Sequence, residues 1–218
     1  MGSTSGRESV LRALRERIPG RFEQEERLSR YRGDYGIFEL DPLTALRAET
    51  EAEVRNVLRV AGEHGCPVVA RAGGSNTGGA AITTGILLLF DHRPFAGLEV
   101  HADSGLAFCG PALRHDHLQS ALEEHGFWLP SDPSSGPLSR IGGNVNTRAS
   151  GPHALRHGAI QHYLRDVRFI TASGDVVDTR HPEEVPARYL NGLRELAGRI
   201  RADHETVRRL EERRNFKW

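Results

Sequence analysis

Hydrophobic residues recur at helical spacing in four parts of the chain. The segments with this spacing are 8–18, 50–65, 113–126 and 188–214, and a shorter charged helix is expected at 22–31. Shorter apolar runs predict strands: buried strands at 67–71 and 86–90, short strands within 99–109, and a hairpin over 164–178 that turns at Ser173-Gly174-Asp175. This mixture of separate helical and strand segments favours an α+β fold.

Composition narrows the class of protein. The 29 Lys and Arg residues balance 29 Asp and Glu residues, so no net charge draws the chain to nucleic acid or to an anionic membrane. No apolar run approaches the roughly 20 residues of a membrane span, and no signal peptide is evident at the N-terminus. Cys66 and Cys109 form no metal or disulfide motif and are expected to be buried thiols in a reducing cytoplasm. His115 and His117 lie two residues apart, so they point apart and are expected on the surface, with no metal.

The first glycine-rich segment, 71–80, stands between two expected strands. Its sequence is Arg-Ala-Gly-Gly-Ser-Asn-Thr-Gly-Gly-Ala. A glycine turn after a strand lets successive backbone N–H groups converge on one point, which suits phosphate oxygens. Arg71, at the strand end, would add a full charge. The segment matches neither the Rossmann nor the Walker glycine pattern.

The second glycine-rich segment, 141–151, reads Ile-Gly-Gly-Asn-Val-Asn-Thr-Arg-Ala-Ser-Gly. The turn at 130–137, rich in proline and serine, stands just before it. Taken alone, the segment is typical of a plain surface loop. Together with the first segment it predicts that both glycine-rich segments face one cleft, with Gly74 and Gly143 on the same side of the molecule.

The order and spacing of 71–80, 130–135 and 142–151 resemble the FAD-binding domain of the vanillyl-alcohol oxidase and p-cresol methylhydroxylase superfamily. The match looks closest to its D-lactate, glycolate and D-2-hydroxyglutarate dehydrogenase branch, and 158–167 and 172–177 continue it. The resemblance implies a two-lobed FAD-binding domain of the p-cresol methylhydroxylase type, truncated before its distal part and lacking the substrate cap domain. The implied domains are an N-terminal helical extension, 1–30, the FAD-binding domain, 31–180, and a helical C-terminal segment, 181–218.

The resemblance also implies which residues bind the cofactor. The expected FAD-binding residues are Arg71, Ala72, Gly73, Gly74, Ser75, Asn76, Thr77, Gly78, Gly79, Ser131, Asp132, Ser134, Gly142, Gly143, Asn144, Thr147, Ser150 and Gly151. Some relatives attach FAD through a histidine in the first segment, where this chain has Ser75, so non-covalent FAD is expected. Asp34 lies in the family's opening segment and is either a backbone cap or a plain turn residue.

Several positions depart from the family pattern. The first segment is one residue shorter than usual, Pro111-Ala112 replaces Pro-Gly, Arg148 replaces an asparagine, and Leu89 stands where an aspartate is common. Arg148 would either reach a phosphate or block the flavin.

No catalytic residue can be assigned, because none of the eleven histidines matches the family's distal catalytic histidine. The resemblance therefore implies the FAD-binding portion of a dehydrogenase of small D-2-hydroxy acids. We expect it to be inactive without a complementary chain. The alternative is a non-catalytic remnant or a partner-binding module of the same fold.

Overall fold

The computed structural model describes residues 4–91 and 93–212. Two compact units divide the chain: Met1–Arg165 with Ile170–Asp175, and Asp166–Phe169 with Val176–Trp218. Each is described separately below. The first contains both glycine-rich segments.

A three-stranded parallel sheet forms the centre of the first unit. Its strands are β1 (Thr44–Leu46), β2 (Val68–Arg71) and β3 (Ile86–Leu89), in the order β1-β3-β2. All four residues of β3 are buried, as expected for a central strand. β2 is an edge strand and only half-buried, with Ala70 exposed, so the expectation of a buried strand was wrong there. β1 was not predicted, because three residues carry too short a pattern.

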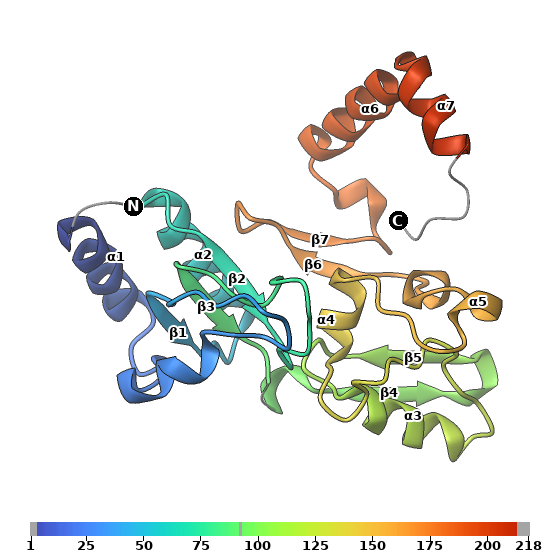
Figure 1. Ribbon diagram of the computed structural model, residues 1–218, viewed down its shortest axis with the longest axis horizontal. Helices are drawn as coiled ribbons and strands as arrows, with labels where there is room; N and C mark the ends of the chain where they lie inside the picture. Colours follow the sequence, from blue (N-terminus) through green and yellow to red (C-terminus); the bar gives the residue numbers. More distant parts are fainter. Residues whose placement is uncertain (1–3, 92, 213–218) are drawn as a thin grey trace. The chain divides into compact units, whose positions relative to one another are not determined.

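Two helices complete the core beside this sheet. Helix α1 (Thr4–Arg17) and helix α2 (Glu51–Glu63) pack against each other, as Figure 1 shows. The core contains residues from both helices and from the sheet, including Leu14, Val57 and Ile86, each 0% exposed. A capping box starts α2: the Thr50 side chain accepts from the Glu53 N–H, and the Glu53 carboxylate accepts from the Thr50 N–H in return. The expected N-terminal helical extension therefore shares the core of the first unit.

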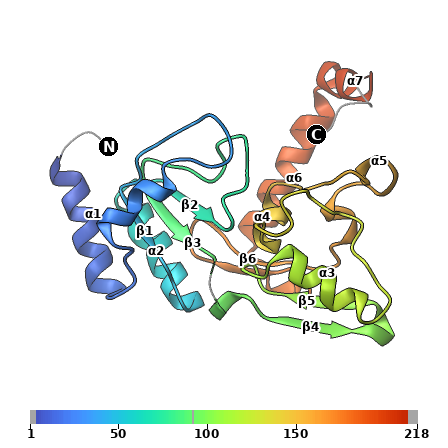
Figure 2. The same ribbon diagram turned by 60° about the horizontal axis from the view of Figure 1, so that its bottom comes forward.

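The rest of the first unit is built on an antiparallel pair. Strands β4 (Leu98–His101) and β5 (Leu106–Cys109) pair in register, and helix α3 (His115–Glu123) lies along them (Figure 2). Leu113, Leu118 and Ile141 form the small core beneath α3. The short elements here are η2 (Arg93–Phe95), η3 (Ala102–Ser104), α4 (Ile141–Asn146), α5 (Ala154–His157) and η4 (Ile160–Tyr163). The segment expected as a second helix is the 3-10 helix η1 (Glu25–Tyr31).

The C-terminal elements are β6 (Arg168–Ile170), β7 (Val176–Asp178), η5 (Pro182–Glu184), α6 (Ala187–Ala202) and α7 (His204–Glu212). β6 and β7 form the predicted hairpin as a two-stranded sheet. The long predicted helix is interrupted at Asp203, whose carboxylate accepts from the Thr206 N–H. Its apolar stripe is open to solvent, with Leu193 63%, Leu196 47% and Ile200 47% exposed. Within the residues that the structure describes, no helix is long and apolar enough to cross a membrane.

Candidate cofactor site

The first glycine-rich segment connects β2 to β3 at the carboxyl end of β2. Gly74 and Gly79 have φ angles of +67° and +80°, in the left-handed region that glycine adopts without strain. Because β2 and β3 are parallel, the connection must return the length of the sheet after leaving this edge. The glycines therefore sit where the chain first turns back.

Arg71 stabilises this turn through hydrogen bonds to backbone carbonyl groups. Its Nη1 atom donates to the carbonyl oxygens of Gly33 at 2.9 Å and Ala81 at 3.0 Å, and more weakly to that of Tyr31 at 3.3 Å. A Cβ atom on Gly74 would lie 2.5 Å from Nη2 of the same guanidinium. Burial lowers the pKa of Arg71. The side chain thus ties the turn to the opening segment through its Nη1 atom.

Asp34 and Asn76 fix the far end of the same turn. The Asp34 carboxylate accepts from the N–H of Gly36 at 2.7 Å and of Gly79 at 2.8 Å. The Asn76 side chain accepts from the N–H of Gly78 at 2.7 Å. Asp34 is therefore a backbone cap, one of the two roles expected for it. The N–H groups of Gly78 and Gly79 are therefore already hydrogen-bonded within the protein.

The middle of the turn keeps its donors available. No acceptor for the N–H groups of residues 73–77 lies in the described chain, 4–91 and 93–212. Backbone N–H groups without a protein partner are either solvated or bind a ligand. Five successive donors of this kind suit an anionic oxygen group.

The second glycine-rich segment begins as the short helix α4, which the sequence did not predict. A Cβ atom on Gly142 would lie 2.6 Å from the Pro111 Cβ, so the helix packs too closely there for any side chain. A Cβ atom on Gly143 would meet the Ala72 Cβ at 3.4 Å. The two glycine-rich segments, far apart in sequence, are therefore neighbours, as the sequence predicted.

A second contact joins the same regions. A Cβ atom on Gly73 would overlap the carbonyl oxygen of Leu138 and come within 3.2 Å of the Ser139 Cα. The backbone leading into α4 thus runs directly past the first glycine-rich segment. Glycine at 73 is required by this approach and not by an unusual φ angle.

Asn144 faces the interior. It is 4% exposed, and its amide nitrogen lies 3.3 Å from His115 Nδ1 and 3.3 Å from Ser139 Oγ. His115 is only 2% exposed, so the expectation of a surface histidine was wrong, whereas His117 is exposed. Burial lowers the pKa of His115, and its Nε2 has no partner in the described chain. Through these contacts Asn144 anchors α4 to His115 of α3 and to Ser139.

The turn before α4 is fastened to the end of the second segment. Ser131 is 0% exposed and donates to the carbonyl of Ala149 at 3.0 Å. Asp132 Oδ2 pairs with His153 Nδ1 at 2.5 Å, and a Cβ atom on Gly151 would overlap Asp132. These residues shape the site. The remaining expected ligands are intermediate or exposed, and they are Ser75, Thr77, Gly78, Ser134, Thr147 and Ser150.

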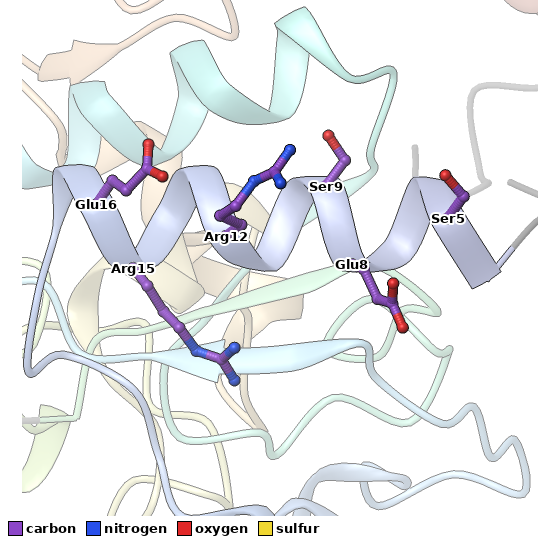
Figure 3. Close-up of a pocket in the computed structure, with 6 residues that line it drawn as sticks. All are labelled: Ser5, Glu8, Ser9, Arg12, Arg15 and Glu16. Carbon is purple, nitrogen blue, oxygen red and sulfur yellow. The ribbon is translucent and has the colours of Figure 1, made fainter.

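Two other features lie elsewhere. A hollow lined by Ser5, Glu8, Ser9, Arg12, Arg15 and Glu16 borders helix α1 alone (Figure 3), and all but Ser9 are exposed, so it is a surface feature of one helix. In the second unit, His181, Glu183 and Glu184 place ligand atoms within 4.8 Å of one another, but all three are exposed. His181 Nδ1 already pairs with Glu183 at 3.5 Å.

A glycine-rich turn whose backbone N–H groups lack a partner in the described chain is typical of a site for a phosphate-bearing cofactor. The sequence model of the FAD binding domain matches residues 42–180, and the chain belongs to this family. FAD is accordingly its cofactor.

Among curated proteins, the glycolate oxidase subunit GlcD of Bacillus subtilis is 33% identical over 58% of this chain and 27% of that protein. The D-lactate dehydrogenase of Archaeoglobus fulgidus is 29% identical over 66% of this chain and 34% of that protein. The chain therefore spans about a third or less of these relatives' length.

Solved structures share the fold. An alkyldihydroxyacetonephosphate synthase superposes with a TM-score of 0.66 at 19% identity, covering 79% of this chain and 38% of that one. A p-cresol methylhydroxylase with bound substrate gives 0.64 at 18% identity, covering 81% and 36%. The mixed helix and sheet arrangement is thus of the p-cresol methylhydroxylase type, as the sequence predicted.

Proposed function

We propose that this chain binds FAD non-covalently between its two glycine-rich segments, as the FAD-binding portion of a dehydrogenase of D-2-hydroxy acids. The observation that carries the proposal is the contact of Gly143 with Ala72, which brings the second segment against the first. The available N–H groups of 73–77 fit the diphosphate of the cofactor. Ser75 has a hydroxyl, which does not form the covalent flavin link that histidine makes.

The residues of the site have separate tasks in this proposal. The turn at 73–77 holds the diphosphate, while Gly142 and Gly143 give the cofactor a wall free of side chains. Asp34 and Arg71 keep the turn rigid, so that its donors are oriented before the ligand arrives. When bound, FAD accepts a hydride from the substrate, and the protein supplies binding and electrostatics.

The proposed substrate class is taken from the names of similar proteins. The similar proteins include a glycolate oxidase subunit, a D-lactate dehydrogenase and a D-2-hydroxyglutarate dehydrogenase. Oxidation of such an acid needs a group that holds the α-carbon near the flavin and a base for the hydroxyl proton. The sequence supplied no residue for either task. We therefore propose that this chain is inactive alone and that a complementary chain provides them.

Dye reduction tests this proposal. Purified chain with added FAD is assayed with D-lactate, glycolate and D-2-hydroxyglutarate, and we expect FAD binding without turnover. Turnover by the chain alone that is abolished by Gly74→Val would refute the inactivity. Gly62→Ala is the matched control, because a Cβ atom on Gly62 meets nothing within 4 Å.

The exposed stripe of Leu193, Leu196 and Ile200 favours one alternative, a partner-binding module of the same fold. Exposed apolar surface of this kind marks interaction sites. A purified protein without flavin absorbance, and without affinity for added FAD, would favour the alternative.

We also propose that the protein works in a reducing compartment such as the cytoplasm. Cys66 and Cys109 are both free thiols, the first buried and the second partly buried. Burial raises the pKa of Cys109 to about 11, so its thiol stays protonated at neutral pH. Protonated thiols are unreactive.

A further inference from the structure

The segment before β1 exposes a group of large apolar side chains. Within residues 35–40, here called the apolar loop, Tyr35 is 65%, Ile37 92% and Phe38 54% exposed, and Leu40 is exposed as well. Single exposed apolar residues are normal, but several gathered on one loop mark a binding surface. The apolar loop is therefore a candidate contact for a ligand.

Hydrogen bonds hold the backbone of the apolar loop in one conformation. Gly33 and Glu39 pair in an antiparallel bridge that closes the loop. Inside it, the Asp34 carboxylate accepts from the N–H of Gly36 at 2.7 Å. Because the backbone is fixed in this way, its side chains meet a ligand without the entropy cost of ordering a mobile loop.

The apolar loop touches the first glycine-rich segment. The N–H of Tyr35 donates to the carbonyl oxygen of Asn76 at 2.9 Å. A Cβ atom on Gly36 would lie 2.3 Å from the carbonyl oxygen of Thr77, so the two backbones are in direct contact. Asn76 and Thr77 belong to the turn at 73–77, whose N–H groups have no acceptor in the described chain. The loop therefore borders the donors proposed for the diphosphate.

The Phe38 ring lies against the last glycine of the same turn. Its Cδ2 atom is 3.5 Å from the position that a Cβ atom on Gly79 would take. The N–H of Gly79 is already bonded to Asp34, so this end of the turn offers an aromatic surface where the middle offers donors. Donors for an anionic group and a ring for stacking thus lie on neighbouring residues of one turn.

FAD has two flat rings, one on either side of its diphosphate. The isoalloxazine reacts in a site from which water is excluded, whereas the apolar loop is open to solvent, as the exposure of Ile37 shows. Adenine takes no part in the hydride transfer and needs no dry site. A base also gains free energy by stacking on an exposed aromatic side chain. The exposure of the loop therefore favours adenine over isoalloxazine.

We infer that the apolar loop, through Phe38 and Tyr35, is the adenine contact of a nucleotide whose diphosphate binds at the first glycine-rich segment. The inference rests on the proposed function, in which this nucleotide is FAD. Stacking removes aromatic surface of both partners from water. The isoalloxazine offers the same flat-ring chemistry, and the test distinguishes the two rings.

Calorimetric titration of the purified chain tests the inference. The probes are FAD, ADP, pyrophosphate, which has no ring, and FMN, which has isoalloxazine but no adenine. We expect Phe38→Ala and Tyr35→Ala each to weaken ADP binding about five- to a hundredfold, the usual effect of losing a stacked ring. Binding of pyrophosphate and FMN should not change. Tyr35→Phe keeps the ring and should keep the affinity. Leu155→Ala on α5, where the side chain is fully exposed, is the control and should match the unaltered chain.

Pyrophosphate separates stacking from a merely structural role. If the variants lost pyrophosphate as strongly as ADP, they would have disturbed the turn itself, and the inference would be overturned. A loss confined to FMN would overturn it as well, because the ring on the loop would then be isoalloxazine. Unchanged ADP affinity in both alanine variants would also refute it and would favour a complementary chain as the cover of the apolar loop.

The outcomes distinguish this inference from the proposed function. FAD binding that is equal in the unaltered chain and in both alanine variants would refute the role of the apolar loop and support the FAD site. ADP binding that depends on Phe38 and Tyr35, without FAD binding, would support the adenine contact and refute the FAD site. Binding of neither FAD nor ADP would refute both.

Discussion

The backbone of Gly73 lies directly against the carbonyl oxygen of Leu138, leaving no room for a Cβ atom. This contact joins the first glycine-rich segment to the backbone that leads into the second. The site therefore depends on one position where two distant parts of the chain meet without side chains between them.

Gly73→Ala should destabilise the fold by about 1–3 kcal/mol, as overpacking usually does. The control is Gly143→Ala, where the added Cβ would meet Ala72 at 3.4 Å and a helical glycine would be replaced by a better helix former. Urea unfolding of the two ligand-free variants measures the difference. Equal stability of Gly73→Ala and the unaltered chain would contradict the close approach.

Arg71→Met should lower the free energy of unfolding by about 1.5–3 kcal/mol, because charged hydrogen bonds to backbone carbonyls are lost. Arg12→Met on α1 is the control and should change it little. If Arg71→Met kept full stability and lost ADP binding, Arg71 would be a phosphate ligand, as the sequence first suggested.

His115 should make stability depend on pH. Burial lowers its pKa below the ordinary value of 6.5, while Asp132 and Asp116 act in the opposite direction. Below pH 6.5 the unfolded chain therefore binds more protons than the folded chain, and stability should fall as the pH falls toward the lowered pKa. The slope contributed by one such group is at most about 1.4 kcal/mol per pH unit.

His115→Gln should remove this contribution, and His117→Gln, on the exposed side of the same helix, should leave it in place. Urea midpoints at pH 7.5, 6.5 and 5.5 make the comparison. An unchanged acid dependence in His115→Gln would show that another group is responsible.

Arg148→Asn should raise stability by about 0.5–1 kcal/mol. Arg148 is exposed and has a φ of +51°, and asparagine adopts this left-handed region more readily than most residues. Thermal unfolding measures the change. If Arg148 blocks the flavin, the same variant should also bind FAD more tightly in a fluorescence titration; unchanged or weaker binding removes the blocking hypothesis.

The sequence predicted those elements whose stabilising features lie within one short segment of the chain. Helix α2 has its capping box and apolar face within one segment, and β3 is a continuous apolar run. β1 was missed, because its three residues are strand only through pairing with β3. Helix α4 was missed because glycines disfavour helices, and contacts with Pro111 and His115 stabilise it instead.

The candidate site likewise has some features that the sequence reveals and others that only tertiary contacts determine. The glycine-rich segments are visible in the sequence and imply their shared role by resemblance. What Arg71 binds is a tertiary property: it was chosen for its place after a strand, but its Nη1 atom binds carbonyls from other segments. Likewise, the spacing of His115 and His117 shows that they diverge but not which one points inward.

Titration of the purified 218-residue chain with FAD, followed by quenching of flavin fluorescence, tests the central claim most directly. We expect saturable binding to one site, competed by ADP and lost in Gly73→Val, with Gly62→Ala as the control. Absence of saturable binding, or binding that Gly73→Val leaves unchanged in a folded protein, would contradict an FAD site between the two glycine-rich segments.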